Sequence, residues 1–115
     1  MGYKAFYSLT VKNISKDEFK KLDKALEDKG IIGYALTKGE MIGQDDAVFY
    51  GDTCCTWYDH EQDMIDISKE FPEATFMLDG DGEESEDFWR KYFKNGESEV
   101  CQAELIYPEP QRIRW

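Results

Sequence analysis

The first thirty residues contain the pattern that most constrains the fold of this chain, an alternating strand followed at once by a capped amphipathic helix. Strand alternation puts one set of side chains on a single face: Tyr3, Ala5, Tyr7, Leu9 and Val11. Ser15 and Glu18 then have the spacing of a capping box. Apolar residues follow at helical spacing, and Lys29-Gly30 is typical of a helix end. The pattern predicts a strand over 3–11 and a helix over 16–29.

The middle of the chain predicts two more strands. Ile31 to Thr37 has the composition of a short strand, and the polar, glycine-bearing segment Gly39 to Asp46 predicts a loop. Ala47 to Tyr58 is rich in aromatic, Thr and Cys residues, which favour a long strand. We expect Trp57, at the end of this strand, to belong to the core.

A second helix is expected to begin after Asp59, which has Gln62 three residues on. Its inner stripe consists of Met64, Ile67, Ser68 and Phe71, and Pro72 ends it near Phe71. Ala74 to Leu78 then predicts a short apolar strand. His60 lies in the first turn, with no Ser or Cys partner at a catalytic spacing, so we expect a solvated helix start rather than acid–base chemistry.

Asn95-Gly96 is a strong signal for a two-residue β-hairpin turn. It predicts strands over 88–94 and 98–107. Trp89, Tyr92 and Phe93 are also spaced as on a helix, so a helix over 88–94 is the alternative. The clear strand after the turn favours the hairpin.

These elements follow the order β-α-β-β-α-β with one further hairpin. The order predicts an α+β fold, a ferredoxin-like β-α-β-β-α-β two-layer sandwich with an additional C-terminal β-hairpin. No linker or repeat divides the chain. We therefore expect one domain over residues 1–110 and a tail over 111–115.

Several local motifs carry a resemblance to known proteins. They are Trp57-Tyr-Asp-His-Glu-Gln-Asp-Met64, Ser68-Lys-Glu-Phe-Pro72, the acidic glycine stretch, Asp87-Phe-Trp89 and Lys94-Asn-Gly96. Across roughly residues 47–107 the chain resembles small ferredoxin-like proteins of unknown function carried by phages, plasmids and gut bacteria. The resemblance implies a fold and a mobile-element origin, and it implies no catalytic residue.

The charge of the chain is strongly negative and uneven. The 115 residues carry a net charge of −11. Residues 1–57 hold eight Lys/Arg and nine Asp/Glu, whereas residues 58–115 hold six and sixteen. Such a field repels nucleic-acid phosphates and attracts basic surfaces. We expect no direct nucleic-acid binding and no membrane binding, and a cytoplasmic location, which is the host cytoplasm if a phage encodes the chain.

Six carboxylates crowd into the nine residues Asp79 to Asp87, directly before an aromatic run. An EF-hand loop starting at Asp79 would need glycine at its sixth position and glutamate at its twelfth, where Glu84 and Arg90 stand. The stretch therefore fails as a calcium loop of that kind. A looser divalent-ion site, a solvated connection between strands and an acidic recognition surface all remain open.

We take the recognition surface as the leading functional hypothesis. The protein would be a non-enzymatic acidic binding protein that meets a basic protein surface, such as that of a host nucleic-acid enzyme or a defence nuclease, and inhibits it. The residues expected to bind are Asp79, Asp81, Glu83, Glu84, Glu86, Asp87, Trp89 and Tyr92. For Trp89, an equal alternative is packing in the core.

The alternatives are a small metal-dependent domain or enzyme that uses the same carboxylates, and a self-associating structural protein. We predict no catalytic residues, no cofactor and no metal ligands. The three cysteines include an adjacent pair, Cys54 and Cys55, and form a poor disulfide framework. We expect these two and Cys101 to be small buried side chains.

Overall fold

The computed structural model describes residues 5–37, 39–52, 54–82 and 88–102. Eight elements follow one another along these residues: β1 Ala5–Lys12, α1 Lys16–Asp28, β2 Glu40–Ile42, β3 Asp46–Tyr50, α2 His60–Glu70, β4 Thr75–Gly82, β5 Phe88–Lys94 and β6 Glu97–Gln102. The chain is therefore a mixed α+β protein, as its sequence pattern predicts.

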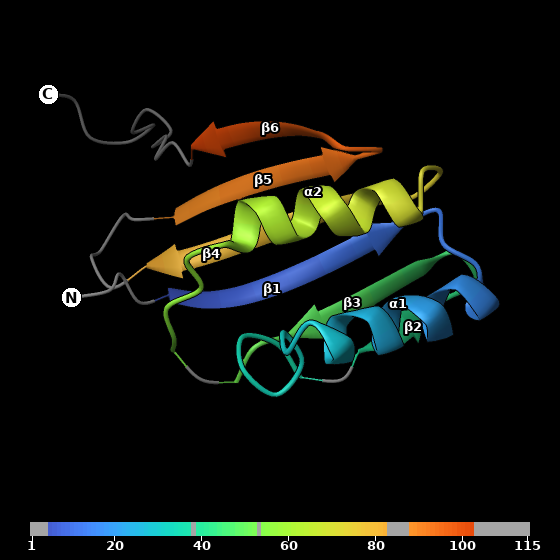
Figure 1. Ribbon diagram of the computed structural model, residues 1–115, viewed down its shortest axis with the longest axis horizontal. Coiled ribbons are helices and arrows are strands. Elements are labelled where there is room, and N and C mark those ends of the chain that lie inside the picture. The colour runs from blue at the N-terminus through green and yellow to red at the C-terminus, as the bar shows by residue number, and fades with distance from the viewer. Residues whose placement is uncertain (1–4, 38, 53, 83–87, 103–115) are drawn as a thin grey trace, which may run out of the picture.

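The six strands form one sheet in the order β2-β3-β1-β4-β5-β6, and every neighbouring pair is antiparallel. Figure 1 shows both helices on the same face of this sheet, α2 over β1, β4 and β5, and α1 over β3 and β2. The opposite face carries no helix of the described residues. We call it the open face.

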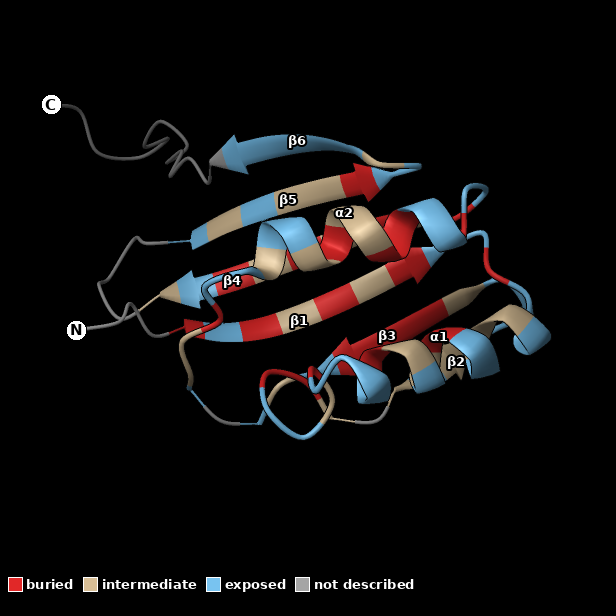
Figure 2. Ribbon diagram, in the orientation of Figure 1, coloured by how far each residue is buried: buried red, intermediate tan, exposed pale blue. Residues whose placement is uncertain are grey.

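The core lies between the sheet and the two helices. β1 alternates between buried and more exposed residues, and its inward set Ala5, Tyr7, Leu9 and Val11 is at most 3% exposed. α1 and α2 cover this set with Leu22, Leu26, Met64 and Ile67, all fully buried. In Figure 2 the buried residues accordingly run along the middle strands, while β6 is exposed along its described side chains.

Local signals placed α1 and the hairpin correctly. The Ser15 hydroxyl accepts from the Glu18 backbone N–H at 3.2 Å, and the Glu18 carboxylate accepts from the Ser15 N–H at 3.1 Å. Gly30, at φ +77°, follows the helix in the left-handed conformation. Asn95 and Gly96 both have positive φ and join β5 to β6, so residues 88–94 are a strand rather than a helix.

The predicted strand from Ile31 to Thr37 is wrong. The Ile31 carbonyl accepts backbone N–H groups from Tyr34, Ala35 and Leu36, which folds the segment into a compact turn. Gly33, at φ +95°, permits this turn. Ile31, Ala35 and Leu36 are buried and fill the core from this turn, whereas Tyr34 is 52% exposed.

The segment Gly39–Asp46, predicted as a loop, contains β2 and the first residue of β3. β2 pairs with β3 from Glu40↔Val48 to Ile42↔Asp46. β2 has only three residues and lies between the glycines Gly39 and Gly43, so the sequence alone gave a weak strand signal. An edge strand of this kind is defined by its neighbour rather than by its own composition.

The predicted long strand Ala47–Tyr58 ends at Tyr50. Gly51 donates its N–H to the Tyr7 carbonyl at 2.8 Å, and the chain then leaves β1 and returns in a single bridge between Cys55 and Ala5. A Cβ on Gly51 would lie 2.4 Å from the Ala35 carbonyl oxygen, so the turn of residues 31–36 crowds the chain here. Trp57 is 6% exposed and belongs to the core, although it lies outside any strand.

The acidic stretch is divided by the structure. Asp79, Gly80, Asp81 and Gly82 extend β4 well beyond the predicted end at Leu78, because β1 pairs with all four and β5 pairs with the first three. Several expected features lie outside the described residues, namely Tyr3, Glu83, Glu84, Glu86, Asp87, the second half of the predicted strand 98–107 and the tail 111–115.

Candidate functional site

The open face presents its side chains in rows that cross the strands. One row runs Tyr50, Ser8, Asp79, Arg90 and Cys101, from β3 through β1 and β4 to β5 and β6. The next row, toward the start of β1, is Phe6, Asp81 and Phe88. Because strand residues two apart share a face, these two rows are direct neighbours.

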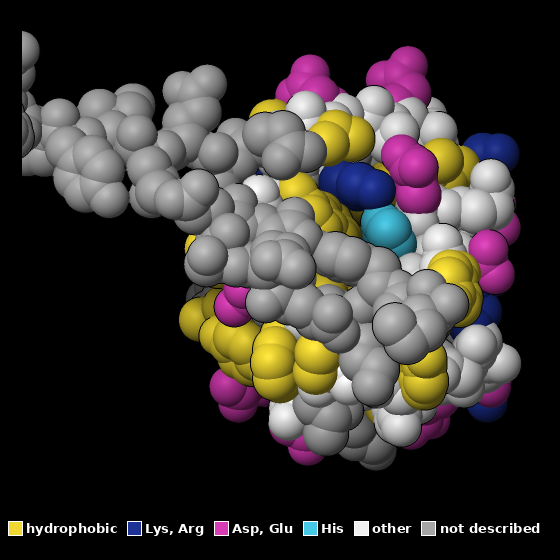
Figure 3. Space-filling view, turned by 90° about the vertical axis from the view of Figure 1, so that its left-hand side faces the viewer, with side chains coloured by type: hydrophobic (Ala, Val, Ile, Leu, Met, Phe, Trp, Pro, Cys, Tyr) yellow, Lys and Arg dark blue, Asp and Glu magenta, His cyan; other side chains and the backbone are white. Residues whose placement is uncertain are grey.

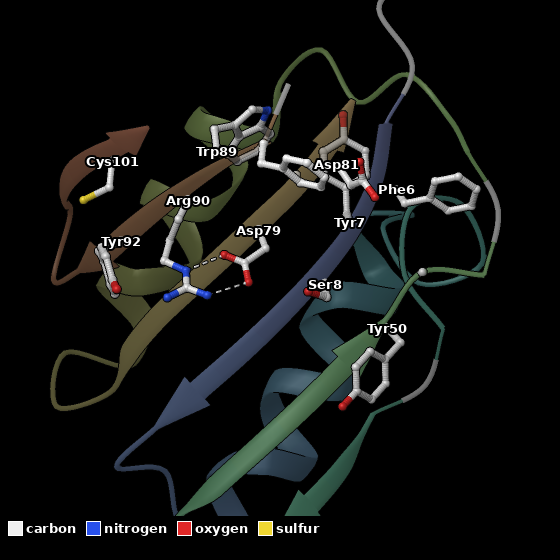
Figure 4. A pocket seen from close by; sticks show the side chains of 13 residues that line it. Phe6, Tyr7, Ser8, Tyr50, Asp79, Asp81, Trp89, Arg90, Tyr92 and Cys101 are labelled. Atoms are coloured by element: carbon white, nitrogen blue, oxygen red, sulfur yellow. Dashed lines mark hydrogen bonds and ion pairs between the residues drawn. The ribbon is translucent and has the colours of Figure 1, made fainter. Parts of the chain in front are cut away.

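A hollow of 610 Å³ opens over these rows. It is lined by Phe6, Tyr7, Ser8, Tyr50, Gly51, Asp79, Gly80, Asp81, Phe88, Trp89, Arg90, Tyr92 and Cys101. Figure 4 shows Phe6 and Tyr50 on one side of the Asp79–Arg90 pair, and Tyr92 and Cys101 on the other. The hollow therefore joins carboxylates from β4 to aromatic rings from three other strands.

Asp79 and Arg90 form a two-point ion pair in the middle of the hollow. Arg90 Nε donates to one carboxylate oxygen at 2.7 Å and an NH₂ group donates to the other at 3.1 Å. The hydrogen bond to Asp79, followed by one to Tyr92, raises the pKa of Arg90. Both side chains are partly exposed. The pair therefore orients Arg90 more than it stabilises the fold.

Asp81 stands in the neighbouring row, where no cation of the described residues pairs with it. It is exposed and makes no hydrogen bond or ion pair with the residues that the structure describes. Its cross-strand neighbours Phe6 and Phe88 are 46% and 47% exposed. The strand register thus places a carboxylate between two phenylalanine residues in this part of the hollow.

Trp89 and Tyr92 were predicted to act together, and the structure places them on opposite faces. Tyr92 lies on the open face beside Arg90, whereas Trp89 pairs with Gly80 and points toward the helices. A Cβ built on Gly80 would lie 2.2 Å from the Trp89 ring, so the indole lies directly against the Gly80 backbone. Trp89 is half-buried and packs against the core, while still bordering the hollow.

Four rings gather on the helix side of the sheet: Tyr7, Trp57, His60 and Trp89. His60 stacks on Trp89 with ring centres 5.0 Å apart and an angle of 22°. Tyr7 meets both tryptophans edge-on, at 5.3 and 6.1 Å. A second hollow of 430 Å³ lies here. Figure 3 shows the one histidine of the chain at the surface beside a basic side chain.

His60 is held at both ring nitrogens. Nδ1 lies 2.9 Å from the Trp57 carbonyl and Nε2 lies 2.7 Å from Lys91 Nζ. A carbonyl only accepts and an ammonium only donates, so the neutral ring carries its proton on Nδ1. Burial lowers the pKa of His60, and the Lys91 charge lowers it further. The prediction of a solvated helix start was therefore wrong at this residue.

The cysteines also differ from expectation. Cys54 and Cys101 are exposed and Cys55 is half-buried, so the prediction of small buried side chains was wrong for two of the three. Burial raises the pKa of the Cys55 thiol. Cys101 lies opposite Arg90 on the open face.

In the described ranges, no three His, Cys, Asp or Glu side chains are grouped so that they could hold a metal ion. Of the eight residues predicted to bind, the described four are Asp79, Asp81, Trp89 and Tyr92, and all four line the hollow.

Within the described ranges, neither helix has the length and apolar character to cross a bilayer.

Sequence reasoning missed Phe6 and Tyr50, the two most exposed aromatic residues of β1 and β3 at this site. A signal for Phe6 was present. The alternation that buries Ala5, Tyr7 and Leu9 sends Phe6 to the other face, where a large aromatic residue is unusual unless something covers it.

Comparison of the chain with protein-family models, with curated proteins and with solved structures finds no match.

Proposed function

We propose that this protein is a non-enzymatic binding protein whose open sheet face docks on a basic surface of another protein. The observation that carries the proposal is the hollow in which Asp79 and Asp81 lie among the exposed rings of Phe6, Tyr50 and Phe88. Carboxylates steer a basic partner to this face, and exposed aromatic rings supply the area that is buried on contact.

The charge of the chain supports a protein partner rather than a nucleic acid. A net charge of −11 repels phosphates and raises the rate of encounter with basic surfaces. Basic surfaces are the ones that bind nucleic acids in other proteins. With the resemblance to mobile-element proteins, the partner class is a host nucleic-acid enzyme or a defence nuclease, and the protein acts as its inhibitor.

We further propose that β1 to β4 with the two helices form a ferredoxin-like unit. The antiparallel strand order β2-β3-β1-β4 and the placement of both helices on one face support this assignment. β5 and β6 then extend the sheet beyond β4. The extension widens the open face and contributes Phe88, Arg90 and Tyr92 to the hollow.

The proposal is tested with a simple cationic probe. A short peptide of alternating lysine and glycine is titrated into isotope-labelled protein at low ionic strength, and a glutamate–glycine peptide serves as the negative control. We expect the amide signals of Phe6, Ser8, Asp81 and Phe88 to shift with the lysine peptide alone. Signals that stay in place, or that move only on the outer surfaces of α1 and α2, would reject the open face as a binding site.

Two variants, each lacking one carboxylate, distinguish a contact inside the hollow from attraction by the overall negative charge of the protein. Asp81→Asn changes the hollow, whereas Glu70→Gln changes an exposed residue at the end of α2. We expect Asp81→Asn to weaken the peptide about tenfold, the loss of one good charged contact. Glu70→Gln should change the affinity less than about twofold. Equal losses would mean that overall charge, not this face, attracts the peptide.

A further inference from the structure

We infer that the partner inserts an arginine side chain into this hollow, with its guanidinium on Asp81 between the rings of Phe6 and Phe88. This inference rests on the proposed function and specifies the chemical group that the site takes. It comes from three features of the described residues, which are the spacing of the row, the unpaired state of Asp81 and the neighbouring Asp79–Arg90 pair.

The row has room for one planar group. Phe6 and Phe88 flank Asp81 on the two adjacent strands, so their backbones are roughly 10 Å apart at the usual strand spacing. A flat group that contacts a ring on each side needs about 3.5–4 Å to each. This spacing leaves room for a guanidinium above the carboxylate, between two rings that turn toward it.

The neighbouring row shows how a carboxylate of this face holds a guanidinium. The Asp79 carboxylate accepts two hydrogen bonds from Arg90, of 2.7 and 3.1 Å. Asp81 lies two residues further along the same strand and the same face, and no described cation pairs with it. Arg90 of the protein itself pairs with Asp79, whereas no cation of the described residues pairs with Asp81, which is flanked by aromatic residues and can take an incoming group.

Arginine suits this position better than lysine does. Its planar guanidinium can stack on a ring while donating two hydrogen bonds to one carboxylate. The lysine ammonium is a compact, strongly hydrated charge that gains less from being placed between two phenyl rings. The two-point contact with the carboxylate supplies part of the preference for arginine, so the share of it that is lost without Phe6 and Phe88 measures the part played by these rings.

The experiment compares an arginine–glycine peptide with the lysine–glycine peptide of equal length and charge. We expect the arginine peptide to bind about tenfold more tightly to the unaltered protein, by calorimetry or fluorescence anisotropy. Phe6→Leu and Phe88→Leu should each reduce this preference, and together reduce it most. Tyr58→Leu is the matched control, because Tyr58 is 76% exposed on the helix side of the sheet.

The outcomes separate the two proposals. Equal affinity for the two peptides at the open face would overturn the arginine site and leave the proposed function standing. Failure of both peptides to bind there would overturn both. A preference for arginine that is undiminished in the Phe6→Leu, Phe88→Leu double variant would overturn the role of these rings. Amide spectra confirm that each variant is folded, and the comparison on the unaltered protein needs no variant.

Discussion

His60 Nε2 accepts a hydrogen bond from Lys91 Nζ at 2.7 Å, so a residue in the first turn of α2 is joined to the middle of β5. Trp89 contacts both partners of this hydrogen bond. Its ring stacks on the imidazole and lies 4.8 Å from the Lys91 ammonium. The neutral His60 is thus one of the links between α2 and the hairpin that extends the sheet.

This contact predicts a dependence of stability on pH. Protonation of His60 would remove the acceptor of Lys91 and place two positive charges side by side, while Glu61 and Asp63 compensate only in part. The pKa is lower in the folded state, so the unfolded state binds the extra proton first. The free energy of unfolding should therefore fall as the pH drops below about 6.5, until the folded pKa is passed.

Urea denaturation at several pH values between about 7 and 5 measures this fall. His60→Gln removes the titrating ring, so its stability should vary less over the same range, whatever its value at neutral pH. The slopes are compared rather than the absolute stabilities, because the variant also loses the stacking on Trp89. Parallel slopes for the two proteins would contradict the role given to His60.

Ser68 makes a second connection between α2 and the hairpin. Its hydroxyl accepts the Gly96 N–H at 2.8 Å and donates to the Ile65 carbonyl at 2.8 Å, and the residue is fully buried. Ser68→Ala leaves the Gly96 N–H without this acceptor. We expect a loss of about 1–3 kcal/mol in the free energy of unfolding, measured by denaturation.

Ser98→Ala is the control for this loss. Ser98 is exposed on β6 and should change stability by less than about 0.5 kcal/mol. Hydrogen exchange adds a local readout. The Gly96 amide should exchange faster in Ser68→Ala alone, and unchanged protection there would show that the hydrogen bond contributes little.

The sequence predicts those parts of the fold that depend on residues close together in the chain. Ser15 and Glu18 specify the start of α1, and Asn95-Gly96 specifies the hairpin, because only residues close in the chain take part. β2 was missed since its pairing with β3 depends on a contact formed in the folded sheet. The extension of β4 through Asp81 was missed for the same reason, since neighbours on both sides impose it.

The site was predictable in part. Asp79, Asp81 and Tyr92 stand out by charge and aromatic character, and they do lie together. The alternation of β1 does place Phe6 opposite the buried residues, but Tyr50 could not be assigned to the site, because its face depends on the register of β3 with β1. The face of Trp89 likewise follows from its register with Gly80, which no local pattern reveals.

The Asp79–Arg90 pair predicts a small effect on stability. It is exposed to water and salt, so Asp79→Asn should change the free energy of unfolding by no more than about 1 kcal/mol. The effect should shrink further at high salt, because ions screen exposed pairs. Thermal melts at two salt concentrations measure it. A loss of several kcal/mol would mean that Arg90 holds β5 on β4 rather than only being oriented by Asp79.

Gly80 should be intolerant of even one methyl group. A Cβ there would lie 2.2 Å from the Cε2 and Cζ2 atoms of Trp89, and the indole is backed by His60 and Tyr7, so it has little room to retreat. We expect Gly80→Ala to cost about 1–3 kcal/mol in the free energy of unfolding. Denaturation followed by tryptophan fluorescence also reports the displaced ring.

A double-variant cycle assigns this cost to the one contact. Trp89→Phe removes the part of the ring system that the new methyl group would meet, so Gly80→Ala should cost at least about 0.5 kcal/mol less in that background. Such coupling is expected only for side chains that touch. Equal costs in the two backgrounds would place the strain elsewhere on β4, and they would contradict the close packing of Trp89 against the strand that carries Asp79 and Asp81.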